Sequence, residues 1–411
     1  MKNAPKSGPP TSSPSFYWQT LFIITFSLLI MNCPDPPEET ICGQGMELVN
    51  DACECIPNSH PSDDDRFCEC DTLYHWDGDL DECVMDTTSH NFTWTIDTFG
   101  TYYTILRDVE IVDENNIWVV GTIRDSIPDS SGAITIKETY NAAHWNGSEW
   151  ILFSIYHGAL ELDDIIYFEE DDIWVCGGSP LHWNGSVWTL YHLWNLGVLN
   201  EDEGGVYHAW GTSSNNMYFV GSYGSIVHYD GTEFTKIESG TDINLYSVSG
   251  TPDGEYVFVC GRNSTSDSII LQIHNQEIKT IYTGNSFNTL PAGAPRVTYV
   301  YGDTAYFASA ISVFKYNYLT DESDVVYDSN HYESISAKGL YVKSPNDLFM
   351  CGSRSEFIHY NGSSWSSDFS VWGQFGYQGV GTYGLDVKDD TVVIVGKCFG
   401  ALRGLIAIGK R

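Results

Sequence analysis

Arginine is scarce in this chain, and it recurs at comparable places in the sequence. Asp plus Glu outnumber Lys plus Arg by 55 to 19. After residue 92, most arginines stand at the start of an apolar stretch or just after its end. The candidate cations are Arg107, Arg124, Arg262, Arg296, Arg354, Arg403 and also Lys397. Guanidinium groups hold carboxylates and phosphates through paired N–H donors, so this set predicts a site for an anionic ligand.

Aromatic residues accompany these cations in two long stretches between apolar runs. Trp194 lies in the first stretch, and Trp372 and Tyr377 lie in the second. Aromatic faces attract cations and offer flat apolar platforms, so the combined set suits an anionic or carbohydrate ligand. The alternative is that the arginines form surface ion pairs with the abundant local acids.

These residues are distant in sequence, so only the fold can bring them together. The phrase His-Trp/Tyr-Asn/Asp-Gly-Ser/Thr occurs four times, at residues 144–148, 182–186, 228–232 and 359–363. Asn-Gly and Asp-Gly supply the positive φ angles of a type I′ turn, so each copy predicts a tight β-hairpin. Recurrence at equivalent sites favours a packing role for the four histidines over a metal ring. Hairpins repeated at such intervals predict an array of small sheets.

A second repeat sets the number of sheets. Seven apolar runs end at residues 121, 177, 221, 261, 309, 352 and 396. Their spacing of 40 to 56 residues suits four-stranded propeller blades. The runs do not alternate polar and apolar residues, which predicts strands buried on both faces. We expect an all-β, seven-bladed β-propeller over residues 92–411, with six or eight blades as alternatives.

The last blade lacks a fourth strand at the end of the chain. Residues 92–97 resemble the fourth strand of another blade, so we expect them to close the ring by pairing with residues 402–408. Closure would protect sheet edges from pairing with other chains. In this topology, the loops after the second and fourth strands open on one face. The six arginines named above as candidate cations would then lie on the rim of this face.

The motif of residues 213–221 followed by 224–231 resembles the propeller repeats of secreted bacterial surface proteins. The resemblance covers residues 92–411 and is weakest in the fifth copy, which lacks the glycine turn. It implies the architecture and an extracellular setting, and no particular activity.

The amino-terminal segment indicates export. Residues 16–31 form an apolar run that suits the core of a signal peptide and is short for a membrane span. We expect a signal peptide over 1–32 and a tether over 33–41. The segment resembles a bacterial lipoprotein signal, which implies lipidation of Cys33 and anchoring to the outer membrane. Asn32 departs from the small residue usual there, so simple secretion and an uncleaved anchor stay open.

A separate cysteine cluster follows this segment. Its members are Cys42, Cys53, Cys55, Cys68, Cys70 and Cys83. An even number of cysteines behind a signal peptide predicts a disulfide module, over residues 42–84. The module resembles EGF-like or inhibitor-like domains, and its pairing stays open.

The same module contains alternating acids, Asp77, Asp79 and Asp81. Alternating carboxylates are typical of calcium loops, although the glycine and distal glutamate of an EF-hand are missing. Calcium is therefore the only cofactor considered, and a solvated acidic loop is the alternative.

Composition and motifs narrow the function. The formal net charge of −36 disfavours nucleic acid and anionic lipid as partners. HExxH, GxSxG and Walker A motifs do not occur in the sequence. We predict non-enzymatic binding, adhesion or scaffolding at the cell surface, with an extracellular glycan or protein as partner. The alternative is a polysaccharide lyase or glycoside hydrolase acting on acidic glycans, which would need an acid and a base converging at the channel mouth.

Overall fold

The chain divides into two compact units, residues 1–69 and residues 70–411. The computed structural model describes residues 46–49, 52–62, 67–71, 73–77, 80, 82–101, 103–128, 130–131, 134–157, 160–264, 267–284, 294–328, 336–352, 357–368, 372, 379–400 and 402–411. Among these residues, no helix has both the length and the apolar character needed to cross a bilayer. The predicted signal peptide, the tether and Cys33 lie outside the described residues.

Disulfides connect short hairpins in the cysteine-rich segment. The hairpins pair β1 (Met46–Val49) with β2 (Ala52–Cys55), β3 (Ser59–Pro61) with β4 (Cys68–Cys70), and β5 (Tyr74–Asp77) with β6 (Glu82–Met85). The disulfides Cys55–Cys68 and Cys70–Cys83 confirm the predicted chemistry. Cys53 is also disulfide-bonded, while Cys42 lies outside the described residues. The boundary between the two units falls inside residues 42–84, so this segment contributes to both units.

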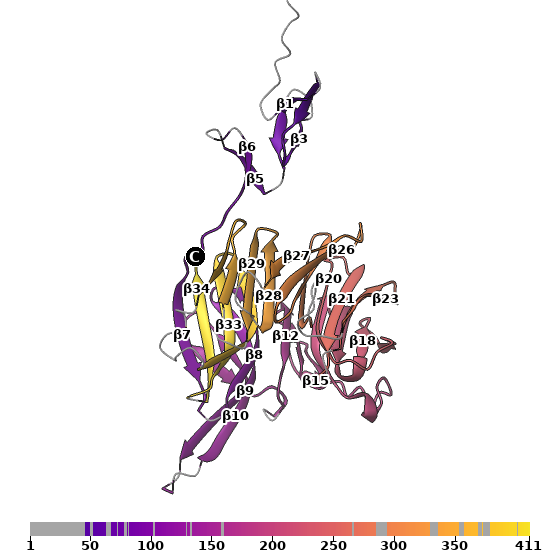
Figure 1. The fold of residues 1–411 in the computed structure, drawn as a ribbon. Helices are drawn as coiled ribbons and strands as arrows, with labels where there is room; N and C mark the ends of the chain where they lie inside the picture. The colour runs from indigo at the N-terminus through magenta and orange to yellow at the C-terminus, as the bar shows by residue number, and fades with distance from the viewer. Residues whose placement is uncertain are drawn as a thin grey trace, which may run out of the picture. The chain divides into compact units, whose positions relative to one another are not determined.

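Seven four-stranded antiparallel sheets make up the described part of the propeller, which confirms the predicted fold (Figure 1). The first six sheets follow chain order: β8 (Ile105–Asp113), β9 (Asn116–Pro128), β10 (Ile134–Trp145), β11 (Trp150–Phe153); β12 (Asp164–Glu169), β13 (Asp172–Cys176), β14 (Pro180–Trp183), β15 (Trp188–Leu190); β16 (Val206–Ser213), β17 (Asn216–Gly221), β18 (Ile226–Tyr229), β19 (Phe234–Ile237); β20 (Leu245–Gly250), β21 (Tyr256–Arg262), β22 (Ser268–His274), β23 (Glu277–Gly284); β24 (Val297–Tyr301), β25 (Thr304–Ala308), β26 (Ser312–Asn317), β27 (Ser323–Asp328); β28 (Ala337–Ser344), β29 (Asp347–Gly352), β30 (Phe357–Tyr360), β31 (Trp365–Ser367). Short 3-10 helices lie between strands: η1 (Ile155–His157), η2 (Glu201–Glu203) and η3 (Ser222–Gly224).

The seventh sheet joins the two ends of the propeller. Its strands are β32 (Val380–Lys388), β33 (Thr391–Cys398), β34 (Arg403–Lys410) and, from before the first blade, β7 (Thr93–Phe99). In Figure 1, β7 runs beside β34, and Ile406 pairs with Asp97 in the register. This is the pairing expected for residues 92–97, and it gives the last blade its outer strand.

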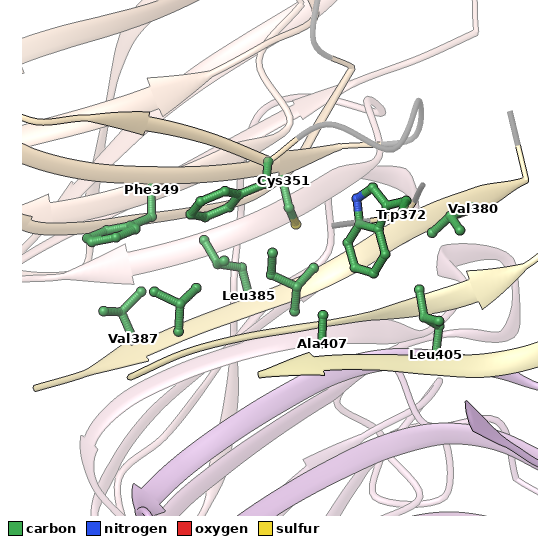
Figure 2. Packing of buried hydrophobic residues seen from close by; sticks show 11 residues of the cluster. Phe349, Cys351, Trp372, Val380, Leu385, Val387, Leu405 and Ala407 are labelled. Atoms are coloured by element: carbon green, nitrogen blue, oxygen red, sulfur yellow. The ribbon is translucent and has the colours of Figure 1, made fainter. Parts of the chain in front are cut away.

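Apolar layers between neighbouring blades form the core. The second strand of each blade is buried on both faces, as the unbroken apolar runs predicted. Figure 2 shows the layer between the sixth and seventh blades, where Phe349 and Cys351 pack towards Leu385. Cys176, Cys260, Cys351 and Cys398 are buried, and the Cys351 thiol lies 3.7 Å from the Gly384 carbonyl oxygen. Burial raises the pKa of the Cys260 thiol, so it packs as a small neutral group.

The repeated histidines make two structural contacts each. His182 stacks on Trp174 with ring centroids 4.3 Å apart, and its Nε2 lies 2.8 Å from Asp172 Oδ1. His144 stacks on Trp118 in the same way, and its Nε2 lies 2.8 Å from Asn116 Oδ1 instead of a carboxylate. Asp172 is the last residue of the acidic run 169–172. This run therefore has structural roles, because it forms the turn between β12 and β13 and holds His182.

One blade departs from the regular pattern. Strands β9 and β10 contain 13 and 12 residues, and their hairpin extends well beyond the other strands of the blade (Figure 1). The sequence analysis did not expect this extension. Arg124 lies on it, opposite Thr139.

Candidate functional site

The innermost strand of most blades begins with a β-bulge. The pairing register shifts by one residue near the start of five described innermost strands, and the extra residues are Arg107, Tyr207, Tyr246, Lys338 and Tyr383. A bulge breaks the alternation of side chains and re-aims one of them. Consecutive residues such as Arg107-Asp108 therefore both line the central channel. The bulges add an extra set of side chains at one mouth of the channel.

The channel contains a cavity of about 640 Å³. Residues from β8, β12, β16, β20, β24, β28 and β32 line it, so every blade contributes. Cavities of about 300 to 1,000 Å³ are typical of small-ligand sites. The mouth with the bulges is the face on which the sequence analysis placed the arginines.

Cations and aromatic rings gather at this mouth. The guanidinium of Arg107 lies 5.2 Å from the ring centre of Tyr383, and that of Arg296 lies 4.5 Å from the ring centre of Tyr246. Two lysines approach Tyr383 at 6.0 Å, Lys338 from β28 and Lys397 from β33. The rings hold the cations by cation–π attraction and leave their N–H donors available for a ligand.

Burial and mutual repulsion lower the pKa values of cations at this mouth. Burial first, and then the Arg262 guanidinium, lower the pKa of Arg296. Burial and the nearby Arg296, Arg262 and Arg107 charges lower the pKa of Lys338 to about 7. Among the residues that the structure describes, Arg107 has one acid within ion-pair distance, with its Nε 3.6 Å from Asp163 Oδ1. Burial raises the pKa of Asp163 to about 6, against the effect of Arg107.

Further along the channel, carboxyl groups connect one blade to the next. The backbone N–H of Ile165 donates to Asp108 Oδ2 at 3.1 Å, and that of Ala209 donates to Asp164 Oδ2 at 2.6 Å. Burial raises the pKa of both carboxyl groups, and the Asp108 charge adds to the effect at Asp164. Ser247 performs the same role in the fourth blade, accepting from the N–H of Thr298 at 3.1 Å. These acids therefore serve the contacts between blades.

Some predicted site residues do not join this cluster. Arg124 lies on the β9–β10 extension, and Arg403 is exposed on β34, the third strand from the channel. Trp194 is exposed, and its Nε1 donates to the Gly204 carbonyl at 3.1 Å. Trp194 lies in the loop between β15 and β16, on the same face of the propeller as the bulges. Arg354 and Tyr377 lie outside the described residues.

The prediction that Trp372 contacts a ligand is wrong. Its side chain is only 1% exposed. In Figure 2 it lies over Leu405 and Val380, inside the apolar layer between the last two blades. Its ring packs among apolar side chains of the last two blades instead of facing the channel mouth.

The predicted calcium loop lies mostly outside the described residues. Asp79 and Asp81 lie outside the described residues, and Asp77 Oδ1 accepts the backbone N–H of Leu80 at 3.2 Å. In the parts of the chain that the structure describes, no group of three or more His, Cys, Asp or Glu side chains could hold a metal ion.

The sequence analysis missed three members of the cluster, Lys338, Tyr246 and Tyr383. Each is the bulge residue of its innermost strand, as Arg107 is. Aligning the starts of these strands would have placed them beside Arg107. The signal for these three residues is therefore present in the sequence.

Comparisons with known proteins agree on the architecture. No family model and no curated protein matches the chain. Among solved structures, YCF48 bound to the D1 peptide is similar, with a TM-score of 0.56, 12% identity, and coverage of 79% of this chain and 97% of that one. YCF48 from Cyanidioschyzon merolae has a TM-score of 0.52 and 12% identity, covering 77% of this chain and 98% of that one. The WD40 propeller domain of Doa1 has a TM-score of 0.53 and 13% identity, covering 78% and 98%. At such identities the likeness shows the fold alone.

Proposed function

We propose that this protein is a non-enzymatic binding protein whose channel mouth holds a negatively charged group of an extracellular glycan or protein. One observation carries the proposal. In a chain of net charge −36, several cations converge at one mouth, and among the described residues Asp163 is the one acid that contacts Arg107. Holding like charges together costs free energy, which an anionic ligand would offset.

The geometry supports a carboxylate or phosphate-like group. Guanidinium groups of Arg107 and Arg296 offer several N–H donors in a fixed fork. The rings of Tyr246 and Tyr383 hold the forks in place, which lowers the entropy cost of binding. A blade scaffold holds such a site rigidly. YCF48, a propeller of similar architecture, was solved with the D1 peptide bound, so this kind of fold can hold a peptide.

The proposal does not extend to catalysis. The alternative function, cleavage of acidic glycans, would use the acids of the channel. Asp108 and Asp164 accept backbone N–H groups of the next blade, and Ser247 does the same without an acidic group. A contact between blades explains their position.

The test is direct binding by the purified protein. A uronic-acid polymer and an acidic peptide would be titrated calorimetrically against the parent and against Arg296→Ala. We expect the substitution to weaken binding by about tenfold, the usual effect of losing one charged hydrogen bond. Arg403→Ala is the matched control, because Arg403 begins β34, the third strand from the channel in its blade. Equal binding by all three proteins would refute the proposal.

We further propose export and a lipid anchor at Cys33 on the outer membrane. The apolar run at residues 16–31 and the disulfides support export, because disulfides form in oxidising compartments. Cys33→Ser should release the protein from membranes in cell fractionation. Retention of the variant at the membrane would contradict the lipid anchor.

A further inference from the structure

Lys338 differs from most lysines of the propeller. Five others form ion pairs with carboxylates: Lys236, Lys279, Lys315, Lys343 and Lys410. For Lys338, the interaction found among the described residues is with the ring of Tyr383, 6.0 Å from its Nζ. Its backbone position in the β28 bulge directs it into the channel.

The amine of Lys338 is available as a nucleophile. With a pKa near 7, about half of the amine is unprotonated at neutral pH. An ordinary lysine, near 10.4, is almost entirely protonated there. Desolvation and neighbouring cations are the means by which proteins prepare a lysine for imine formation.

The neighbours of Lys338 define what it would attack. Arg107 lines the same cavity as Lys338 and shares the Tyr383 ring with it, and the charge of Arg296 acts on Lys338 as well. Guanidinium groups can hold a carboxylate, and the cavity of about 640 Å³ admits a small molecule or the end of a chain. If the carboxylate of a ligand binds the arginines while its carbonyl carbon reaches the Lys338 amine, the two groups must lie next to each other in the ligand. This describes a 2-oxo acid.

We propose that the channel mouth captures 2-oxo acids, including open-chain 2-oxo sugar acids at the end of a glycan, as a reversible imine on Lys338. The proposal rests on the anion-binding function above and names its ligand class. It adds covalent capture without turnover.

The step balances without a further reagent. The Nζ lone pair attacks the 2-carbonyl carbon, and a proton moves from the nitrogen to the carbonyl oxygen, which gives a carbinolamine. The hydroxyl then leaves with the second nitrogen proton as water, and the C=N bond forms. Water reverses both steps. The ligand carboxylate stays on the guanidinium groups throughout and offsets their repulsion.

The experiment traps the imine by reduction. Full-length protein is incubated with pyruvate and cyanoborohydride, and modified peptides are identified by mass spectrometry. We expect about tenfold or more adduct on Lys338 than on any other lysine, because its free-amine fraction is larger. Lys338→Arg and Lys338→Met should remove this adduct. Lys279→Arg is the control, because Lys279 lies on β23, the outermost strand of its blade, and pairs with Asp321; this variant should keep the adduct on Lys338.

Two further measurements separate the possible outcomes. Lactate has the carboxylate and lacks the carbonyl, so its binding tests the anion site alone. If lactate binds and pyruvate leaves no adduct on Lys338, the imine is refuted and the anion site stands. If neither lactate nor the uronic-acid polymer binds, the proposed function fails.

The role of the arginines is tested with a neutral aldehyde. Arg296→Ala removes a charge that lowers the pKa of Lys338, so it reduces the free amine as well as the hold on a carboxylate. Trapping of propanal on Lys338 measures the effect on the amine alone. Trapping of pyruvate should slow by about tenfold more than trapping of propanal, since one charged contact is also lost. Equal slowing for both carbonyl compounds would mean that Arg296 does not hold the carboxylate, and would overturn the assignment of a 2-oxo acid.

Discussion

Lys338 and Asp163 titrate near neutral pH at the channel mouth, and protonation of either residue favours anion binding. Burial also raises the pKa of Asp386, which lines the same cavity, to about 6, and its protonation acts in the same direction. Lys338, with its pKa near 7, gains a positive charge as the pH falls. Asp163, with its pKa raised to about 6, loses its negative charge beside Arg107. Protonation at either residue makes the mouth more positive. A bound anion favours the protonated forms, so non-covalent affinity should rise on acidification.

The affinity for lactate should therefore increase by about tenfold between pH 8 and pH 5.5, because one opposing charge is removed and one favourable charge is added. The measurement is calorimetric titration across that range, in which lactate stays ionised. Lys338→Met should remove the part of the rise centred near pH 7 and leave the part near pH 6. Imine trapping should change in the opposite direction, since it needs the free amine. A lactate affinity that falls on acidification would contradict the assignment of both groups.

Some residues of the channel mouth could be predicted from the sequence, and others could not. Arg107, Arg262, Arg296 and Lys397 were predicted because each follows or precedes an apolar run that is visible in the sequence. Lys338 was missed because a bulge arises from pairing between two strands, and one strand does not encode it alone. Trp372 was misplaced because its burial depends on the gap between two blades, which is set by residues such as Leu405, far along the chain.

At the scale of elements, a strap of residues 86–92 fastens the amino-terminal side of the propeller to the sixth blade. The Asn361 side chain donates to the Thr88 carbonyl at 3.0 Å. Nδ1 of His90 lies 2.8 Å from Nδ1 of His359, whose Nε2 lies 2.7 Å from Asp347 Oδ1. The same carboxylate accepts two bonds from the carboxy-terminal residue, Arg411. One acid thus holds both ends of the propeller.

The tautomers of this cluster follow from its acceptor. A carboxylate can only accept, so His359 donates from Nε2 and its neutral Nδ1 accepts from Nδ1 of His90. The other nitrogen of His90 lies 3.1 Å from Ser364 Oγ and accepts from it. If both rings were protonated, two N–H groups would face each other. Burial lowers the pKa of His90, and a positive charge on His359 would lower it further, against the effect of Asp347.

The strap should therefore loosen as the pH falls below 6.5, the ordinary value for histidine. The docked state favours neutral His90, so its contribution is complete above that value and is lost as the pH falls through the lowered pKa. Hydrogen exchange, corrected for intrinsic rates, should show several-fold faster exchange at residues 86–92 at pH 5.5 than at pH 7.5. His90→Ala should exchange quickly at both values. Equal protection of the parent at both pH values would show that the strap is held without His90.

The blades could be predicted from the sequence, whereas the extension of the β9–β10 hairpin could not. Asn-Gly turns and seven apolar runs are local signals, and their spacing encodes the blades directly. The closing strand was predictable because the last blade lacked an outer strand and residues 92–97 had the matching pattern. The long β9–β10 hairpin continues past the apolar run with mixed residues, such as Arg124-Asp125, whose pattern resembles a loop.

At the scale of the whole molecule, the net charge opposes the local charge of the mouth. A protein of charge −36 repels anions at long range, while the cations at the mouth attract them at contact. Salt affects these two terms differently. The Debye length falls from about 30 Å at 0.01 M to about 8 Å at 0.15 M, so the long-range repulsion is screened first. Contacts inside the channel are partly shielded from ions and weaken less.

The association rate of an anionic ligand should therefore rise with salt, opposite to the usual behaviour of a basic site. For a uronic-acid oligomer, we expect an increase of about two- to tenfold between 0.01 M and 0.15 M NaCl, as the repulsive field of the molecule is screened. Stopped-flow or surface binding kinetics would measure it, with a neutral oligosaccharide as the control. Arg296→Ala should raise the dissociation rate and keep the same salt trend. An association rate that falls steadily with salt would mean that the mouth, and not the whole acidic surface, governs the approach of the ligand.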